Sequence, residues 1–67
     1  MELSARNQLK GRIKEIKSEG ISSEVILDVA GQEVCSNITT SSVSRLGLKV
    51  GDEAYAVVKA SSVMIMK

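Results

Sequence analysis

The fold is decided by residues 39–48, which read Thr-Thr-Ser-Ser-Val-Ser-Arg-Leu-Gly-Leu. Hydroxyl side chains open this stretch, and serine and threonine are favoured at helix N-caps. Val43 and Leu46 stand three residues apart, a spacing that places both side chains on one helical face. Gly47 follows where a left-handed residue would end a helix, and Leu48 is placed to contact Val43 as in a Schellman motif. The stretch therefore predicts one short helix over residues 40–46.

Segments rich in β-branched residues lie on both sides of this helix, and glycines at 20, 31 and 51 mark turns between them. The expected strands are Leu3 to Lys17, Ile21 to Val29, Glu33 to Thr39, Ala54 to Lys59 and Ser62 to Met66. Three strands, a helix and two strands follow the order of the OB-type Greek-key barrel. The sequence thus predicts an all-β fold, a five-stranded OB-like Greek-key barrel that forms a single domain over residues 1–67.

The first strand carries two irregularities. Its apolar residues lie on one face up to Ile13, and the parity then slips by one residue to Ile16. Such a slip predicts a β-bulge, which would let one strand serve two parts of a barrel. Gly11 fits the same interpretation, because a glycine within a strand often marks a bend or a close backbone approach.

The small size of the chain predicts an oligomer. A domain of 67 residues usually needs a disulfide, a metal or a partner subunit for stability. The lone Cys35 and the absence of histidine leave the partner subunit. Apolar residues make up 43% of the chain, and the last two expected strands are apolar on both faces. Strands without a polar face are buried on both sides, so we expect a second subunit to cover one of them.

Composition argues against several classes of function. The net charge of +1 lacks the basic surplus of a nucleic-acid-binding domain, and no apolar run is long enough to span a membrane. No signal-peptide pattern is present, and a free cysteine fits a reducing compartment, so we expect a cytoplasmic protein.

Catalysis is also disfavoured by the residue types present. Without histidine, the usual acid–base and nucleophilic arrangements are missing. The scattered carboxylates are typical of a solvated surface, and they are Glu15, Glu19, Glu24 and Asp28. The sequence therefore predicts a protein that is not an enzyme and that holds no cofactor and no free metal cation.

Hydroxyl and cationic side chains point instead to an anion site. The candidate donors are Ser4, Arg6, Thr39, Ser42, Lys59 and Ser61, none of which adjoins a carboxylate. A fully deprotonated dianion such as molybdate, tungstate or sulfate needs donors only, whereas phosphate carries protons that require an acceptor. The alternatives are a helix cap for the hydroxyls around Thr39 and a solvated strand end for Lys59. Composition and spacing leave these alternatives open.

Three blocks of the chain resemble the molbindins, which are small Mop-type molybdate-binding proteins related to the molybdate-binding domains of molybdate transport regulators. The opening Met-Glu-Leu-Ser-Ala-Arg-Asn-Gln-Leu-Lys-Gly carries the most specific part of the likeness. The second block comprises Ser36 to Thr39 and Ser42 to Leu48, and the third comprises Gly51 to Ala54 and Val57 to Val63. Thr40-Ser41 departs from the acidic residue or glutamine that other members often carry at this point.

The resemblance implies an OB-like barrel that assembles as a homohexamer, a trimer of dimers, with molybdate or tungstate bound between subunits. The site residues that it implies are Ser4, Ala5, Arg6, Thr39, Ser42, Lys59, Ala60 and Ser61, with the alanines contributing backbone N–H groups. It also implies a second class of site on the threefold axis, which we assign to Glu19, Gly20, Ile21 and Ser22.

The leading hypothesis is therefore cytoplasmic binding and storage of molybdate at subunit interfaces. One alternative is an OB-type nucleic-acid-binding module, although Tyr55 is the only aromatic residue available for base stacking. The other is a purely structural assembly module in which anion binding is incidental.

Overall fold

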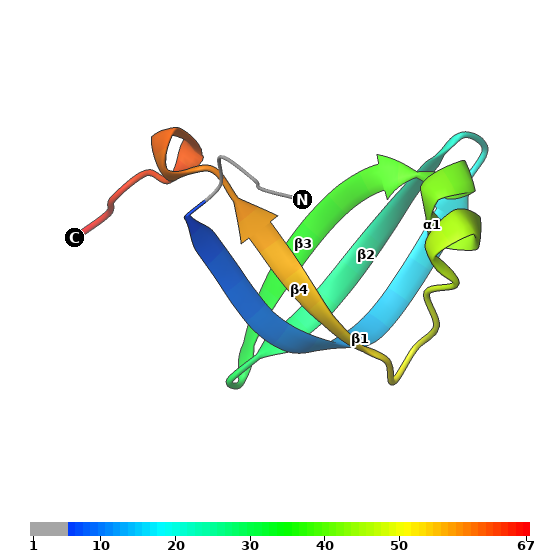
Figure 1. Cartoon of the computed structure of the whole chain (residues 1–67), viewed down its shortest axis with the longest axis horizontal. Helices are drawn as coiled ribbons and strands as arrows, with labels where there is room; N and C mark the ends of the chain where they lie inside the picture. Colours follow the sequence, from blue (N-terminus) through cyan, green and yellow to red (C-terminus); the bar gives the residue numbers. More distant parts are fainter. Residues whose placement is uncertain (1–5) are drawn as a thin grey trace.

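The computed structural model describes residues 6–67, which form four antiparallel strands and one short α-helix (Figure 1). The helix lies between the third and fourth strands, as expected, and a single 3-10 turn follows the last strand. The elements are β1 (Asn7–Glu19), β2 (Ser22–Val29), β3 (Gln32–Thr39), α1 (Thr40–Leu46), β4 (Glu53–Val58) and η1 (Ala60–Ser62).

The strands form one sheet in the order β3-β2-β1-β4. Strands β1, β2 and β3 are joined by hairpins, and β4 returns to lie beside β1, which is the Greek-key order. The long strand β1 pairs with β4 along its first half, from Asn7 to Arg12, and with β2 along its second half, from Arg12 to Glu19. The sheet curls into a half-barrel whose two edges are β3 and β4 (Figure 1).

The predicted bulge in β1 is confirmed. Ile13 pairs with Leu27 and Glu15 pairs with Ile26, so Lys14 is the extra residue. The pairing of β1 with β4 ends here. Ile13 N–H donates to the Asp52 carbonyl oxygen at 2.8 Å, and the Ile13 carbonyl accepts from Gly51 N–H at 2.8 Å, in the loop just before β4. Beyond Ile13, β1 pairs with β2 alone. The bulge thus lets one strand serve both halves of the sheet.

Gly11 marks a close backbone approach, also as predicted. A Cβ atom at this position would lie 2.7 Å from the carbonyl oxygen of Asp28 and 2.8 Å from Cγ2 of Val29. A side chain at position 11 would therefore force β1 and β2 apart.

The core is small and aliphatic. Ile13, Val25 and Leu27 are 1%, 3% and 4% exposed, and a ring of half-buried aliphatic residues packs around them. Val43 and Leu48 belong to this ring, so the helix and the residue after it close one end of the half-barrel.

The helix begins and ends where the sequence predicted. The side chain of Thr39 caps its N-terminus, and Gly47 ends it in the left-handed conformation with φ +64°. Gly47 N–H donates to the Ser44 carbonyl and Leu48 N–H donates to the Val43 carbonyl, each at 3.1 Å. These two bonds are those of a Schellman motif.

The predicted fifth strand, Ser62 to Met66, is wrong for the single chain. Residues 60–62 form the 3-10 turn, and residues 63–67 lie outside any strand and lead away from the sheet (Figure 1). Met64, Ile65 and Met66 are each about nine-tenths exposed. A β-branched, apolar segment forms a strand only where another strand offers hydrogen bonds, and η1 turns the chain away from β4 before it can pair.

Without a fifth strand the half-barrel stays open. A groove of about 460 Å³ runs between its edges, lined mainly by apolar residues of β3 and β4 together with Leu46 and Leu48. On β4, Tyr55 and Val57 are 58% and 46% exposed, whereas Ala54 and Ala56 pack on the core. Over residues 6–67, no helix is long and apolar enough to cross a membrane.

Candidate functional site

The predicted donors Thr39 and Ser42 lie together at the start of α1. Thr39 has an extended backbone, and its Oγ1 accepts from Ser42 N–H at 3.1 Å. The two hydroxyl oxygens are 2.7 Å apart, and Ser41 Oγ lies 3.3 Å from Thr39 Oγ1. The capping role considered for this stretch is therefore present, and Thr39 and Ser42 form a compact hydroxyl cluster on the surface.

Arg45 adds a positive charge to this cluster that sequence reasoning did not assign to the site. Its Nη2 donates to Ser42 Oγ at 3.3 Å. The signal in the sequence is the spacing of three residues, which places positions 42 and 45 side by side on a helix. Because Ser42 Oγ accepts this bond, the proton of its hydroxyl remains available for Thr39 or for an anion.

The two positively charged residues predicted for the site, Arg6 and Lys59, lie just beyond the outermost pair of β1 and β4, at the other end of β1. The outermost pair of β1 and β4 is Asn7 with Val58, and Arg6 and Lys59 are the next residues along the chain, just outside the two strands. Among residues 6–67, neither one forms an ion pair, whereas Lys10, Lys14 and Lys17 each lie within 4.0 Å of a glutamate. Ala60 and Ser61 follow Lys59 directly in η1.

The two groups of donors do not meet within one chain. Arg6 and Lys59 flank the start of β1, whereas Thr39 pairs with Ser22 beside the end of β1. A strand of 13 residues spans roughly 40 Å along its path. Figure 1 shows the start of β1 and α1 on opposite sides of the molecule. A site that uses both groups therefore requires a second chain.

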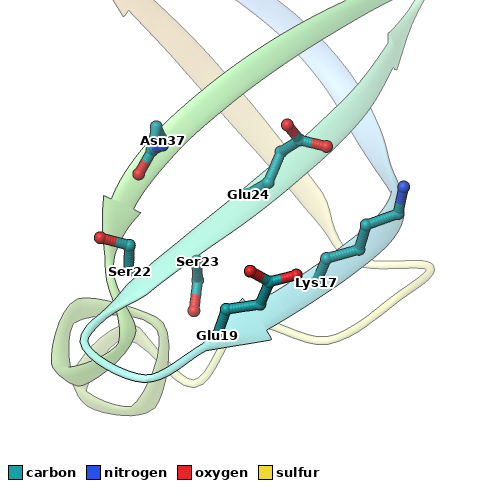
Figure 2. Close-up of a pocket in the computed structure, with 6 residues that line it drawn as sticks. All are labelled: Lys17, Glu19, Ser22, Ser23, Glu24 and Asn37. Carbon is teal, nitrogen blue, oxygen red and sulfur yellow. The ribbon is translucent and has the colours of Figure 1, made fainter.

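The predicted second site lies at the turn between β1 and β2, next to a shallow pocket of about 340 Å³ (Figure 2). Of the four residues assigned to it, Glu19 and Ser22 line this pocket, Gly20 is in the left-handed conformation, and Ile21 is 86% exposed. The other residues that line the pocket are Lys17, Ser23, Glu24 and Asn37. Two carboxylates and one lysine make the pocket of a single chain a poor match for a dianion.

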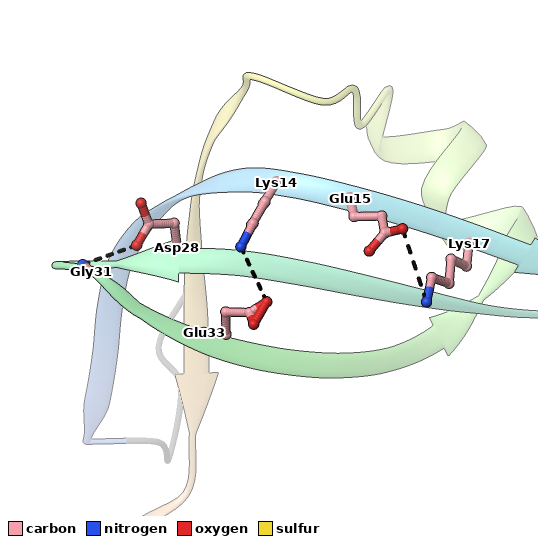
Figure 3. A network of polar contacts seen from close by, with 6 residues as sticks. All are labelled: Lys14, Glu15, Lys17, Asp28, Gly31 and Glu33. Atoms are coloured by element: carbon pink, nitrogen blue, oxygen red, sulfur yellow. Dashed lines mark hydrogen bonds and ion pairs between the residues drawn. The ribbon is translucent and has the colours of Figure 1, made fainter.

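Three other carboxylates, Glu15, Asp28 and Glu33, make polar contacts along β1, β2 and β3 (Figure 3). Glu33 lies 3.3 Å from Lys14, and Glu15 lies 3.9 Å from Lys17. Asp28 Oδ1 accepts from Gly31 N–H at 2.9 Å and so stabilises the turn between β2 and β3.

In the part of the chain that the structure describes, no cluster of three or more acidic, histidine or cysteine residues could hold a metal ion. Ser4 and Ala5 lie outside the described residues.

The sequence profile of the TOBE domain matches residues 3–65. The chain belongs to the TOBE domain family. The resemblance to the molbindins is thereby confirmed, and the single TOBE domain accounts for nearly the whole sequence. Molybdenum-pterin-binding protein 1 of Clostridium pasteurianum is 46% identical over 67 residues, which cover 98% of each chain.

Two solved structures share the fold of this TOBE domain closely. A molybdate-binding protein from Sporomusa ovata has a TM-score of 0.95 and 36% identity, and each chain covers the other completely. The cytoplasmic molybdate-binding protein ModG, solved with molybdate bound, has a TM-score of 0.89 and 45% identity. The similarity covers 96% of this chain and 46% of the ModG chain.

Proposed function

We propose that this TOBE domain binds molybdate in the cytoplasm and stores it without transforming it. The observation that carries the proposal is the pair of donor clusters at the two ends of β1, Arg6 with Lys59 and Thr39 with Ser42, neither of which contains a carboxylate. Relatives that are named for molybdenum and for molybdate support the choice of ion, and ModG is named as a cytoplasmic protein. Tungstate has the same charge and shape, so we expect it to bind as well.

Each donor has a distinct role in this proposal. Arg6 and Lys59 supply positive charge, and Ser4, Thr39, Ser42 and Ser61 donate hydroxyl protons to the oxygens of the ion. Ala5 and Ala60 contribute backbone N–H groups. The first hydrogen bond of η1 is donated by Ser62, so the N–H groups of Ala60 and Ser61 precede it and suit an external acceptor.

We further propose that the sites form between subunits of a homohexamer built as a trimer of dimers. The separation of the two donor clusters supports this, because one chain cannot enclose an ion with both. A single chain also leaves apolar surface exposed to water, in the open groove between β3 and β4 and at residues 63–66. Neighbouring subunits would bury this surface. We assign the second class of site to Glu19, Gly20, Ile21 and Ser22. It would likewise need donors from neighbouring copies, because the pocket beside it carries two carboxylates.

The ligand in this proposal is the free oxyanion. The Clostridium relative is named for a molybdenum–pterin compound, but a pterin ring calls for aromatic stacking and this chain offers Tyr55 alone. The same shortage, together with a net charge of +1, argues against binding to nucleic acid. No observation favours binding to a membrane.

Calorimetric titration of the purified assembly with molybdate, sulfate and phosphate tests the proposal. Molybdate should bind more tightly than sulfate, because the charges are equal and the longer Mo–O bonds fill a larger pocket. Phosphate should bind weakly, since its protonated oxygen needs a strong acceptor such as a carboxylate and the proposed set contains none. Equal affinity for molybdate and sulfate would contradict the proposed function, and an assembly that binds neither ion would support a purely structural module.

A further inference from the structure

Ser23 is the one polar residue among residues 6–67 whose side chain is buried, with 1% of its surface exposed. It lies on β2 directly opposite Ser18 of β1, close to the turn between these strands (Figure 2). Burying a hydroxyl group lowers stability unless the group is hydrogen-bonded. An alanine would fill this site without that requirement, so packing alone does not explain the serine.

The Ser23 hydroxyl joins three elements. Its Oγ lies 2.8 Å from Ser18 Oγ of β1 and 2.8 Å from Thr40 Oγ1, the first residue of α1. A hydroxyl donates one proton and accepts others, so Ser23 can bond to both neighbours at once. The result is a chain of three hydroxyls that runs from the hairpin of β1 and β2 to the helix start.

Thr40 is the residue through which this chain reaches the candidate site. Its backbone N–H donates to the Ile21 carbonyl at 2.9 Å, so its main chain and its side chain are both attached to the β1–β2 hairpin. The preceding residue is Thr39, whose side chain bonds to Ser42. The bond between Ser23 and Thr40 therefore adds a side-chain attachment next to the Thr39–Ser42 hydroxyl pair, beside the pairing of Thr39 with Ser22 of β2.

We propose that Ser23 is a positioning residue for oxyanion binding, which it serves by fixing the Thr39–Ser42 hydroxyl pair to the β1–β2 hairpin through Thr40. This inference rests on the proposed function, because it assumes that the pair donates to the ion. Ser23 itself does not touch the ion. Its role is to hold two donors in one place, so that molybdate does not have to order them when it binds.

Calorimetric titration with molybdate of the assembled Ser23→Ala and Thr40→Val variants tests this. Each substitution removes one end of the hydrogen bond and nearly conserves volume. We expect each to weaken binding about tenfold, the order of magnitude that one lost hydrogen bond produces. The double variant should bind no more weakly than either single variant, because both changes break the same bond.

Two further variants separate positioning from a general effect on stability. Thr40→Ser keeps the hydroxyl group and should restore affinity to within about twofold of the unmodified protein. Ser44→Ala removes an exposed hydroxyl from the same helix and should leave affinity unchanged. Circular dichroism and light scattering establish that each variant is folded and assembled before titration.

An assembled Ser23→Ala protein with unchanged affinity would overturn the proposal, as would a Thr40→Ser protein as weak as Thr40→Val. If neither Ser23→Ala nor Thr40→Val assembles, the bond serves the fold alone and the positioning role is refuted. Failure of the unmodified protein to prefer molybdate over sulfate would instead remove the proposed function on which the inference rests.

Discussion

Arg6 and Lys59 differ in their surroundings from the three lysines of β1. Lys10, Lys14 and Lys17 each lie within 4.0 Å of a glutamate, whereas Arg6 and Lys59 form no ion pair among residues 6–67 and stand just beyond the outermost pair of β1 and β4. In the proposed site, a dianion bound beside them is held by both charges.

Replacing Arg6 with alanine should weaken molybdate binding at the interface site by about 10- to 100-fold. A hydrogen bond to a charged group contributes about 1.5–3 kcal/mol, and no other side chain supplies a second guanidinium at this end of β1. The oligomer should persist, because Arg6 lies outside the apolar core. Titration calorimetry and light scattering measure the two effects.

The matched control is Lys10→Ala, which removes the same charge four residues further along the chain, within β1. Lys10 pairs with Glu53, so its replacement should change the affinity by less than about twofold. An Arg6→Ala protein that binds molybdate as tightly as the Lys10→Ala protein would count against the site.

At the scale of elements, β1 and α1 show what local sequence can specify. The bulge was predictable because the apolar residues change parity between Ile13 and Ile16, and only an extra residue keeps both facing inward. The helix ends were predictable because a hydroxyl cap and Gly47 act within one turn of the chain. Ser23 was missed because its contacts depend on which elements meet in space, whereas Arg45 was missed although its spacing of three residues from Ser42 is visible in the sequence.

Thr39 caps the helix, and we propose that it also donates to the ion. One substitution can separate these two roles. Thr39→Asp keeps a good N-cap, so the free energy of unfolding should stay within about 0.5 kcal/mol of the unmodified protein. The new carboxylate should nevertheless repel a dianion and reduce molybdate affinity by more than about tenfold. Chemical denaturation and titration calorimetry measure the two quantities.

Gln32→Glu is the control, because it adds the same charge at the distant turn between β2 and β3. Its affinity for molybdate should be nearly unchanged. If Thr39→Asp and Gln32→Glu bind molybdate equally well, Thr39 acts as a cap only.

The close approach at Gly11 gives a prediction for β1 itself. Gly11→Ala would place a methyl group 2.7 Å from a backbone oxygen of β2, and overpacking of this kind typically costs about 1–3 kcal/mol. Urea denaturation should show this loss, whereas Gln8→Ala on the exposed part of the same strand should change stability by less than about 0.5 kcal/mol. A Gly11→Ala protein as stable as Gln8→Ala would mean that the strands separate without cost.

At the scale of the whole molecule, the single chain leaves much of its apolar surface in water. Val57 lies on the edge strand β4, and four more apolar residues follow that strand, namely Val63, Met64, Ile65 and Met66. Their exposed fractions range from 46% to 96%. The sequence predicted a strand for residues 62–66 because its residue types fit one. Strand formation also requires a free edge within reach, and this condition is set by tertiary or quaternary structure and not by composition.

Charged substitutions on this surface should break the assembly. Met64→Asp and Val57→Asp would each bury an unpaired carboxylate if the proposed subunit contacts form, at a cost of several kcal/mol. Light scattering should therefore show smaller species, and molybdate binding should be lost with them. Ser44→Asp, on the opposite side of α1 from Leu46, is the control and should leave the oligomer intact. Assembled Met64→Asp and Val57→Asp proteins would refute the burial argument.

In the proposed assembly, one ion is held by the Arg6–Lys59 end of one subunit and the Thr39–Ser42 end of another. Anomalous diffraction from a crystal of the assembly grown with molybdate tests this arrangement, because the metal's signal locates every bound ion. We predict a peak between subunits, within hydrogen-bond distance of Arg6 and Lys59 from one chain and of Thr39 or Ser42 from its neighbour. Peaks enclosed by a single chain, or peaks remote from both clusters, would rule this arrangement out.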